Sequence, residues 1–317
     1  MLAKSLQKGD TIGIIAPSNP ITQDRKFMLD YAIKKFENLG FKVVCSKNCF
    51  NIDKYEVSGG EPQERADDFN DMFSNPKIKA IYCAHGGDTA NQILPLIDFE
   101  AIKQNPKIFL GMSDIDVLHL AINTKTKLVV FHGSDPKSGR PGKPMDLDIE
   151  YTWQNFQNRM MNKSKEIPAS SERICVREGI AEGKIIGCNL SSILKLAGTP
   201  FFPNFENSIL FLEGYSENTK KAICKLQQLK EIGVFDKIKG IVIGYVVGFQ
   251  DEEWIKENNI KSKYEDIVLD ITKEYNFPIL KTNDFGHKCP NCFLPIGGTA
   301  KLDATNKSIE IIEDFLN

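Results

Sequence analysis

The chain has 317 residues, a net charge of −2 from 40 basic and 42 acidic side chains, and an apolar content of 41%. This size and composition allow two domains with real hydrophobic cores. No excess of basic residues indicates a nucleic-acid partner, and no block of like charge indicates a disordered tail. Residues 1–18 contain no long apolar segment, so we expect no signal peptide, no membrane partner and a cytoplasmic location.

Strand-like and helix-like segments alternate over residues 1–133. Short runs of Ile, Val and Phe alternate with segments whose apolar residues recur at helical spacing. Such alternation predicts an α/β domain in which a parallel sheet has helices on both faces. The expected strands are 11–16, 41–45, 78–84, 107–110 and 127–131, and the expected helices are 24–39, 61–74, 91–97 and the segment from 115.

Residues 134–146 are rich in Pro, Gly and charge, which makes them the best candidate for a domain boundary. We expect an N-terminal domain at 1–135, a linker with a bridging helix at 136–166, and a second domain at 167–317. The bridging helix is expected at 151–162; beyond it, strands are expected at 174–177, 183–186, 208–212, 238–245, 300–303 and 308–312, and helices at 190–197, 217–231 and 265–275.

Ser113 lies where the predicted strand 107–110 leads into a helix. One interpretation is a helix cap, because Ser113 and Asp116 fit the Ser-x-x-Asp capping pattern. The other is a nucleophile on a tight turn, with helix amides facing a substrate oxygen. The stretch alone favours the cap, because Ile115 replaces the second glycine of a Gly-x-Ser-x-Gly turn.

Two further features follow predicted strands. Gly86-Gly87-Asp88-Thr89 fits no nucleotide-binding pattern, but a diglycine lets another group approach the backbone closely. Among the four histidines, His119 is expected in a helix core, whereas His85 and His132 lie at strand ends where they could face a site. His287 lies in a stretch, 283–287, that we predict to be a polar loop, and such loops often provide catalytic groups.

Glu213 ends the apolar run 209–212, where a buried carboxylate is costly unless it has a partner. The alternative is that its side chain simply reaches solvent. A serine, a glutamate and a histidine in this chain order could form a hydrolase triad, in which the carboxylate orients the imidazole. Spacing alone does not select Ser113, Glu213 and His287 from the other candidates.

The chain has eight cysteines, too few for a disulfide scaffold at this length. Cys289 and Cys292 form the one close pair and could belong to a zinc or redox site. No second pair and no His-x(3–5)-His pattern accompanies them, so we expect no metal and no cofactor. A metal or redox protein is kept as a less favoured alternative.

Several stretches, taken together and in order, resemble the S66 peptidase family, which includes LD-carboxypeptidases and microcin C self-immunity hydrolases. They are 9–20, 86–122, 183–203, 209–245 and 285–304. The resemblance implies that Ser113, within Gly-Met-Ser-Asp, attacks a carbonyl, that His287 acts as base and then acid, and that Glu213 orients His287. The fold that it implies is a flavodoxin- or amidotransferase-like α/β N-terminal domain joined to a smaller, β-rich α+β C-terminal domain, with the site between the two. It also implies an oxyanion hole from the amides of Gly87 and Asp114, and a homodimer.

Some residues depart from the family pattern. Met112 replaces the usual aromatic residue, Asp116 stands where threonine is common, and Gly214 replaces an acidic residue. LD-carboxypeptidases tend to have arginine at the position of His85. The loop that contains His85 is therefore closer to the immunity branch. These departures keep an inactive peptide-binding homologue as an alternative to an enzyme.

The resemblance leaves two substrates open. One is a murein tetrapeptide that loses its terminal D-alanine, and the other is a peptidyl-nucleotide cut at the amide beside its phosphoramidate. Gly86 and Asp88 are further candidates for substrate binding. Trp153, on the expected bridging helix, could stack on a purine, although a core position is favoured.

Overall fold

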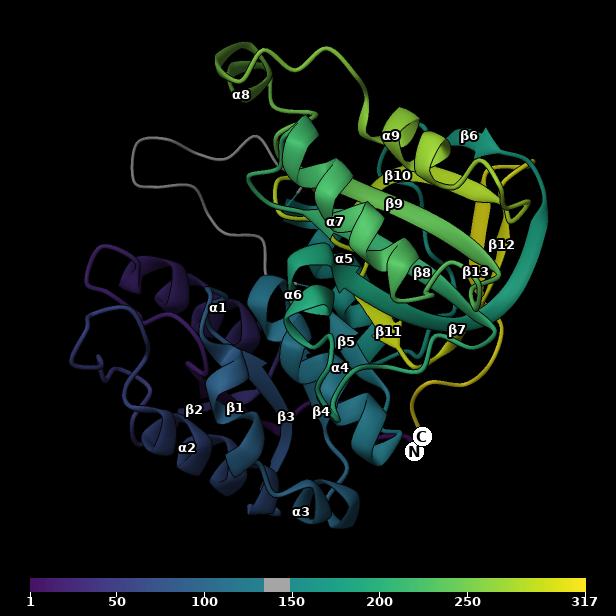
Figure 1. Cartoon of the computed structure of the whole chain (residues 1–317). Helices are drawn as coiled ribbons and strands as arrows, with labels where there is room; N and C mark the ends of the chain where they lie inside the picture. Colours follow the sequence, from purple (N-terminus) through teal and green to yellow (C-terminus); the bar gives the residue numbers. More distant parts are fainter. Residues whose placement is uncertain (134–148) are drawn as a thin grey trace.

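Two β-sheets organise the chain in the computed structural model, which describes residues 1–133 and 149–317 (Figure 1). The domain boundary predicted near residue 135 lies outside the described residues. The two ends of the chain lie side by side. Ala3 and Leu316 form a parallel β-bridge, and the Ser5 amide donates to the Asn317 carbonyl. No helix in the described part of the chain is long and apolar enough to cross a membrane.

The first sheet has six strands in the order β11-β5-β4-β3-β1-β2. Strands β1 to β5 pair in parallel in the order 2-1-3-4-5, which is the flavodoxin-like arrangement. Every residue of β4 and β5 is buried, as expected for parallel strands covered on both faces. The strands are β1 (Thr11–Ile15), β2 (Lys42–Cys45), β3 (Ile78–Cys83), β4 (Ile108–Gly111), β5 (Val130–His132) and β11 (Leu294–Ile296).

Three helices of the first half, α1, α2 and α4, follow the predicted ones closely, whereas α3 was not predicted. Helix α2 begins at a capping box formed by Glu61 and Glu64 and has Pro62 at its first position, where a missing amide hydrogen costs nothing. The helix predicted at 91–97 is instead a 3₁₀ helix that contains Pro95. The elements are α1 (Lys26–Asn38), α2 (Pro62–Ser74), η1 (Ala90–Leu96), α3 (Phe99–Gln104), η2 (Ser113–Ile115) and α4 (Asp116–Thr126).

The second sheet has seven strands in the order β13-β12-β7-β8-β9-β10-β6. Its four central strands are parallel, and the outer strands β12, β13 and β6 are antiparallel to their neighbours. The predicted fold class is confirmed: an α/β domain is followed by a second, α+β domain. The strands are β6 (Ile174–Arg177), β7 (Ile180–Asn189), β8 (Ser208–Gly214), β9 (Gly240–Val246), β10 (Ile279–Gly286), β12 (Thr299–Asp303) and β13 (Ser308–Ile311).

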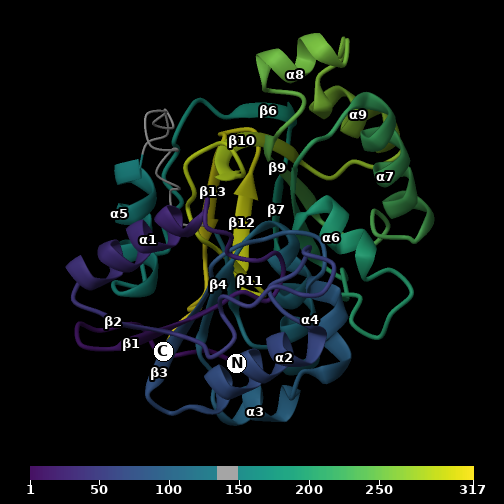
Figure 2. The ribbon, with the colours of Figure 1, turned by 90° about the vertical axis from the view of Figure 1, so that its left-hand side faces the viewer.

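Helices flank the strands on two sides in Figure 2. Helix α5 lies on one side, beside α1 of the first half, against which it packs through Trp153 and Phe36, and α6, α7 and α9 lie on the other. The helices are α5 (Ile149–Met160), α6 (Leu190–Lys195), α7 (Thr219–Glu231), α8 (Glu252–Glu257) and α9 (Tyr264–Ile271).

The second half differs from the sequence prediction at three elements that we did not predict: β10, β11 and the short helix α8. Residues 283–286, predicted to be a polar loop, belong to β10. The strand tolerates the buried Asp284 because Arg173 forms an ion pair with it at 2.8 Å and Ser170 donates to its other oxygen. Strand β11, which we did not predict, leaves the second half and pairs antiparallel with β5 of the first sheet (Figure 1). Strand β11 therefore forms an edge of the first sheet, whereas β12 and β13, which follow it in the chain, belong to the second.

Candidate active site

Ser113 lies directly beyond β4 in a left-handed backbone conformation, with φ at +67°. A residue other than glycine rarely adopts this conformation, and such positions concentrate at functional sites. In the described chain no side chain caps η2 or α4, so the capping interpretation is wrong. The strained turn from strand to helix instead has the form of a nucleophile elbow.

The diglycine packs against this turn. A Cβ atom on Gly86 would lie 2.8 Å from Ser113 Cβ and 3.2 Å from Ser113 Oγ. A Cβ atom on Gly87 would lie 2.0 Å from Asn19 Oδ1. Only glycine at these two positions allows the loop after β3 to approach Ser113 and Asn19 this closely. The diglycine therefore does more than form an ordinary tight turn.

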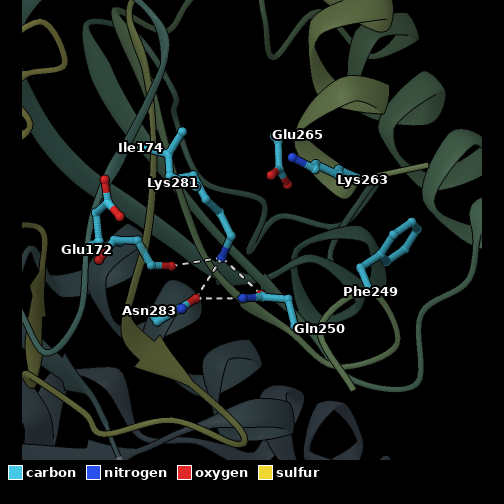
Figure 3. Close-up of a pocket in the computed structure, with 9 residues that line it drawn as sticks. Glu172, Ile174, Phe249, Gln250, Lys263, Glu265, Lys281 and Asn283 are labelled. Carbon is cyan, nitrogen blue, oxygen red and sulfur yellow. Dashed lines mark hydrogen bonds between the residues drawn. The ribbon is translucent and has the colours of Figure 1, made fainter. Parts of the chain in front are cut away.

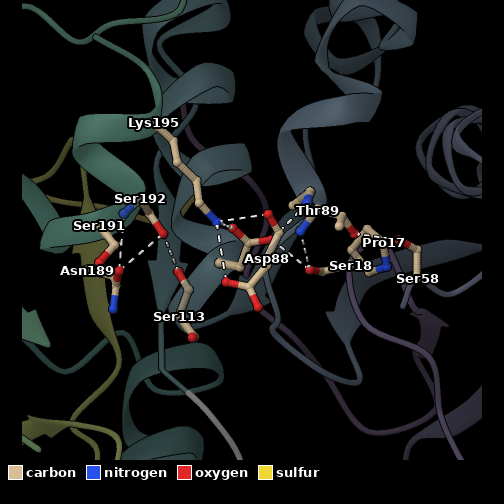
Figure 4. Close-up of polar contacts among 12 residues, drawn as sticks. Pro17, Ser18, Ser58, Asp88, Thr89, Ser113, Asn189, Ser191, Ser192 and Lys195 are labelled. Atoms are coloured by element: carbon tan, nitrogen blue, oxygen red, sulfur yellow. Dashed lines mark hydrogen bonds and ion pairs between the residues drawn. The ribbon is translucent and has the colours of Figure 1, made fainter. Parts of the chain in front are cut away.

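Asp114 joins several loops beneath the serine. Its buried carboxylate accepts hydrogen bonds from Ser18 Oγ at 2.6 Å, the Ala90 amide at 2.8 Å and Lys195 Nζ at 2.6 Å (Figure 4). Lys195 also donates to the Asp88 carbonyl at 2.9 Å, while the Asp88 side chain is exposed. The loops after β1, β3 and β4 are therefore held together at the carboxyl ends of neighbouring strands, where parallel sheets usually bind ligands.

Glu213 and His287 meet at the carboxyl ends of β8 and β10. Glu213 is only 1% exposed, so the alternative that it reaches solvent is wrong. Its Oε2 lies 2.6 Å from His287 Nδ1, and its Oε1 accepts a hydrogen bond from Asn189 Nδ2 at 2.7 Å. The ring of Tyr215 packs on the imidazole, with 4.8 Å between centroids. This pairing holds His287 with Nδ1 facing the carboxylate and leaves Nε2 for another partner.

A short chain of hydrogen bonds joins this pair to the serine. Asn189 caps α6 by accepting from the Ser192 amide at 3.1 Å. Ser192 Oγ then donates to the Ser113 carbonyl at 3.0 Å, as Figure 4 shows. Within residues 1–133 and 149–317, no hydrogen bond joins Ser113 Oγ directly to His287. Catalytic hydrogen bonds often close only when substrate is present.

Asp116 forms a second buried cluster behind the elbow. Its Oδ1 lies 2.9 Å from His119 Nδ1 and 2.8 Å from His132 Nδ1, and its Oδ2 accepts from the Asn189 amide at 2.8 Å. Burial opposes ionisation of Asp116, but the facing charge of His132 and the two imidazole contacts hold its pKa well below the usual range. His119 lies in the core as expected, whereas His132, expected to face a site, is fully buried.

His85 and Trp153 lie in different surroundings. His85 contacts Arg25 at the start of α1, beside the diglycine. Trp153 is 5% exposed and packs against Phe36 and Phe156 at centroid distances of 5.4 and 5.8 Å. Stacking of Trp153 on a purine therefore does not fit this conformation, because the ring is already enclosed by core side chains.

The cysteine pair does not have the surroundings of a reactive thiol. Cys289 and Cys292 are buried free cysteines, and in the described residues no group of three or more His, Cys, Asp or Glu side chains is arranged so that it could hold a metal ion. Burial raises the pKa of Cys289, and burial together with Asp284 raises that of Cys292 to about 12. Thiols in such an environment remain protonated and unreactive at neutral pH, which disfavours a redox role.

A pocket beside β10 contains none of the predicted site residues (Figure 3). At its base, Lys281 Nζ donates to the Gly244 carbonyl at 2.6 Å, to Gln250 Oε1 at 2.9 Å and to Asn283 Oδ1 at 3.0 Å. Burial lowers the pKa of Lys281 to about 8. Because its donors are already bonded to neighbouring protein groups, Lys281 holds the segment after β9 against β10. The pocket is lined by Glu172, Ile174, Phe249, Gln250, Lys263, Glu265, Lys281, Thr282 and Asn283.

Two family models match the chain: the LD-carboxypeptidase N-terminal domain over residues 12–133 and the C-terminal domain over residues 182–302. The chain belongs to the S66 peptidase family. The resemblance predicted from the sequence is therefore confirmed, and this S66 peptidase is a hydrolase of the carboxypeptidase type.

Individual relatives cover nearly the whole chain. The S66 peptidase is 32% identical to a probable murein peptide carboxypeptidase of Bacillus subtilis, over 97% of this chain and 93% of the relative. It is 29% identical to the microcin C7 self-immunity protein MccF of Escherichia coli, over 100% and 97% of the two chains. A solved structure of MccF in complex with glutamyl sulfamoyl guanosine aligns with a TM-score of 0.87 at 26% identity, covering 100% and 99%.

Several polar residues at this site of the S66 peptidase were not predicted from the sequence. Asn189, Ser192, Lys195 and Tyr215 all contact a candidate site residue. Asn189 had a local signal, because asparagine before a helical segment is typical of an N-cap. That signal predicts only the start of α6, however, and not the second bond from Asn189 to Glu213.

Proposed function

We propose that this S66 peptidase hydrolyses a carboxy-terminal amide bond of a small peptide through a triad of Ser113, His287 and Glu213. The observation that supports it most is the contact of the buried Glu213 with the partly exposed His287, at 2.6 Å, linked through Asn189 and Ser192 to the strained serine. A buried carboxylate on Nδ1 favours the imidazole tautomer whose Nε2 accepts a proton.

In the proposed reaction, His287 Nε2 takes the proton of Ser113 Oγ as that oxygen attacks the substrate carbonyl carbon. The amides of Gly87 and Asp114 donate to the oxyanion that forms. The carbon–nitrogen bond then breaks, and His287 returns the proton to the leaving amine. A water molecule repeats the attack on the acyl-enzyme, with His287 as base, and releases the acid.

The substrate is proposed at the level of its class. The Bacillus subtilis relative is named for a murein peptide and MccF for immunity to microcin C7, so both a murein tetrapeptide and a peptidyl-nucleotide are candidates. Gly86 and Asp88, which border Ser113 and Lys195, are proposed to contact the substrate. We further propose a homodimer, and a division into domains 1–135 and 167–317 joined by 136–166, with the site between them.

The test compares product masses after incubation with a murein tetrapeptide and with a peptidyl-nucleotide analogue. We expect Ser113→Ala to lower turnover by about 10⁴ or more. Ser208→Ala is the matched control, because it removes a buried serine hydroxyl at the opposite end of β8 from Glu213 and should leave turnover unchanged. Equal turnover by wild type and Ser113→Ala would remove Ser113 as nucleophile. Tight binding of a peptide that survives long incubation would instead favour the inactive homologue.

A further inference from the structure

Lys195 connects the two halves of the molecule at the site. It is the last residue of α6, in the second half, and its ammonium reaches the loops of the first half (Figure 4). Lys195 Nζ donates to Asp114 Oδ1 at 2.6 Å and to the Asp88 carbonyl at 2.9 Å. These two residues directly follow Ser113 and Gly87 in the chain. One side chain therefore holds both backbone segments that would form the oxyanion hole.

The Asp114 carboxylate extends this connection. While Oδ1 accepts from Lys195, Oδ2 accepts from the Ala90 amide at 2.8 Å and from Ser18 Oγ at 2.6 Å. The Asp114 side chain is fully buried and Lys195 is 27% exposed. An ion pair in this environment is screened much less than one at the surface and holds a more defined geometry.

Helix α6 contacts the nucleophile by a second route. Ser192, one turn before Lys195, donates from Oγ to the Ser113 carbonyl at 3.0 Å. Helix α6 therefore bonds to both residues that share the Ser113–Asp114 peptide group. Ser192 donates to the Ser113 carbonyl, and Lys195 donates to the Asp114 side chain. The amide of that peptide group is the proposed oxyanion donor.

We propose that Lys195 is a positioning residue that aligns the two oxyanion-hole amides by holding Asp114 and the Asp88 carbonyl. The proposal rests on the proposed function, because it presumes that Ser113 is the nucleophile. Oxyanion stabilisation requires donors already in place when charge develops, and a misplacement of about 1 Å can cost about 10²-fold in rate. Lys195 need not touch the substrate to have this effect.

The test uses the full chain with Lys195→Met, Lys195→Arg and a matched control, Lys230→Met. Lys230 is 26% exposed and forms a 2.8 Å ion pair with Glu274, remote from the loops at Ser113. The probe is an alkyl fluorophosphonate: Ser113 Oγ attacks phosphorus, fluoride leaves with the bonding electron pair, and the serine proton passes to His287. The phosphoryl oxygen needs the same donors as a substrate oxyanion, so the labelling rate reports on them.

We expect Lys195→Met to label at Ser113 about ten- to a hundred-fold more slowly than wild type. Peptide hydrolysis should show a lower kcat with KM within about two-fold, because the change acts on the transition state. Hydrogen–deuterium exchange should accelerate in segments 84–92 and 111–116. Lys195→Arg, which keeps a charged donor, should recover part of the rate, and Lys230→Met should match wild type in every measurement.

Labelling of Lys195→Met within about two-fold of wild type would overturn the proposal, even if exchange accelerated, because the link would then be structural only. Unchanged exchange in both segments would overturn it as well. A wild-type protein that neither labels at Ser113 nor hydrolyses peptide would refute the proposed function, which is a distinct result. The exchange comparison would in that case still decide whether Lys195 holds the two loops.

Discussion

The Glu213→Gln substitution tests how the site sets the tautomer of His287. Each carboxylate oxygen of Glu213 has its own donor, with Oε2 facing His287 Nδ1 and Oε1 facing Asn189 Nδ2. A glutamine has only one acceptor oxygen. If that oxygen faces His287, the glutamine NH₂ faces the NH₂ of Asn189. If it faces Asn189, the glutamine NH₂ faces Nδ1 and forces the proton onto Nε2.

The size of the effect follows from this geometry. The second arrangement gives an imidazole that cannot accept the serine proton, and loss of the right tautomer in a serine triad costs about 10⁴ in kcat. That factor corresponds to about 5 kcal/mol of transition-state stabilisation. The first arrangement leaves buried donors unsatisfied and costs about 1–3 kcal/mol of folding stability. We therefore expect Glu213→Gln to lose activity strongly and stability moderately.

A second substitution should restore the pattern of donors and acceptors. In the double variant Glu213→Gln with Asn189→Asp, the glutamine NH₂ can donate to the new carboxylate while its oxygen faces His287 Nδ1. The introduced aspartate would still cap α6, because its carboxylate accepts from the Ser192 amide as the asparagine oxygen does. The assay is kcat for peptide hydrolysis, with Tm measured on each variant. Activity of the double variant no higher than that of Glu213→Gln, at restored Tm, would refute this reasoning.

Two other predictions concern the surroundings of the serine. Gly86→Ala places a methyl group 2.8 Å from Ser113 Cβ, so the turn at Ser113 must shift. We expect kcat to fall about 100-fold with a small loss of Tm. A kcat equal to that of wild type would contradict this prediction. For His132, burial opposes charging, but Asp116 raises the pKa above its ordinary 6.5. A histidine whose pKa is raised in the folded state contributes folding stability that is fully present below pH 6.5. This stability is lost as the pH rises through the folded-state pKa. The difference in unfolding free energy between wild type and His132→Gln, measured with urea, should therefore become smaller as the pH rises. A difference that grows with pH would contradict this prediction.

Most elements could be predicted because their signals are local. The helix expected at 61–74 is α2, Pro62–Ser74, and the run expected as a strand at 208–212 belongs to β8, Ser208–Gly214. Apolar spacing reports which face of a segment is buried, and this depends on a few neighbouring residues. The prediction failed where the local signal was weak or misleading. Strand β11 has three residues, and the polar end of β10 is compensated by Arg173, more than a hundred positions away in the chain.

For the site, the sequence by itself determined that Ser113 and the diglycine follow strands of one parallel sheet, so that they share an edge. The family resemblance added Glu213 and His287 as partners. Only the tertiary structure decided that Asn189 bridges to Glu213, that Ser192 holds the Ser113 carbonyl from 79 positions away, and that Lys195 pairs with Asp114 from 81 positions away. The reason is that a chain's periodicity describes the face each segment buries, whereas contacts between segments depend on how the two sheets pack together.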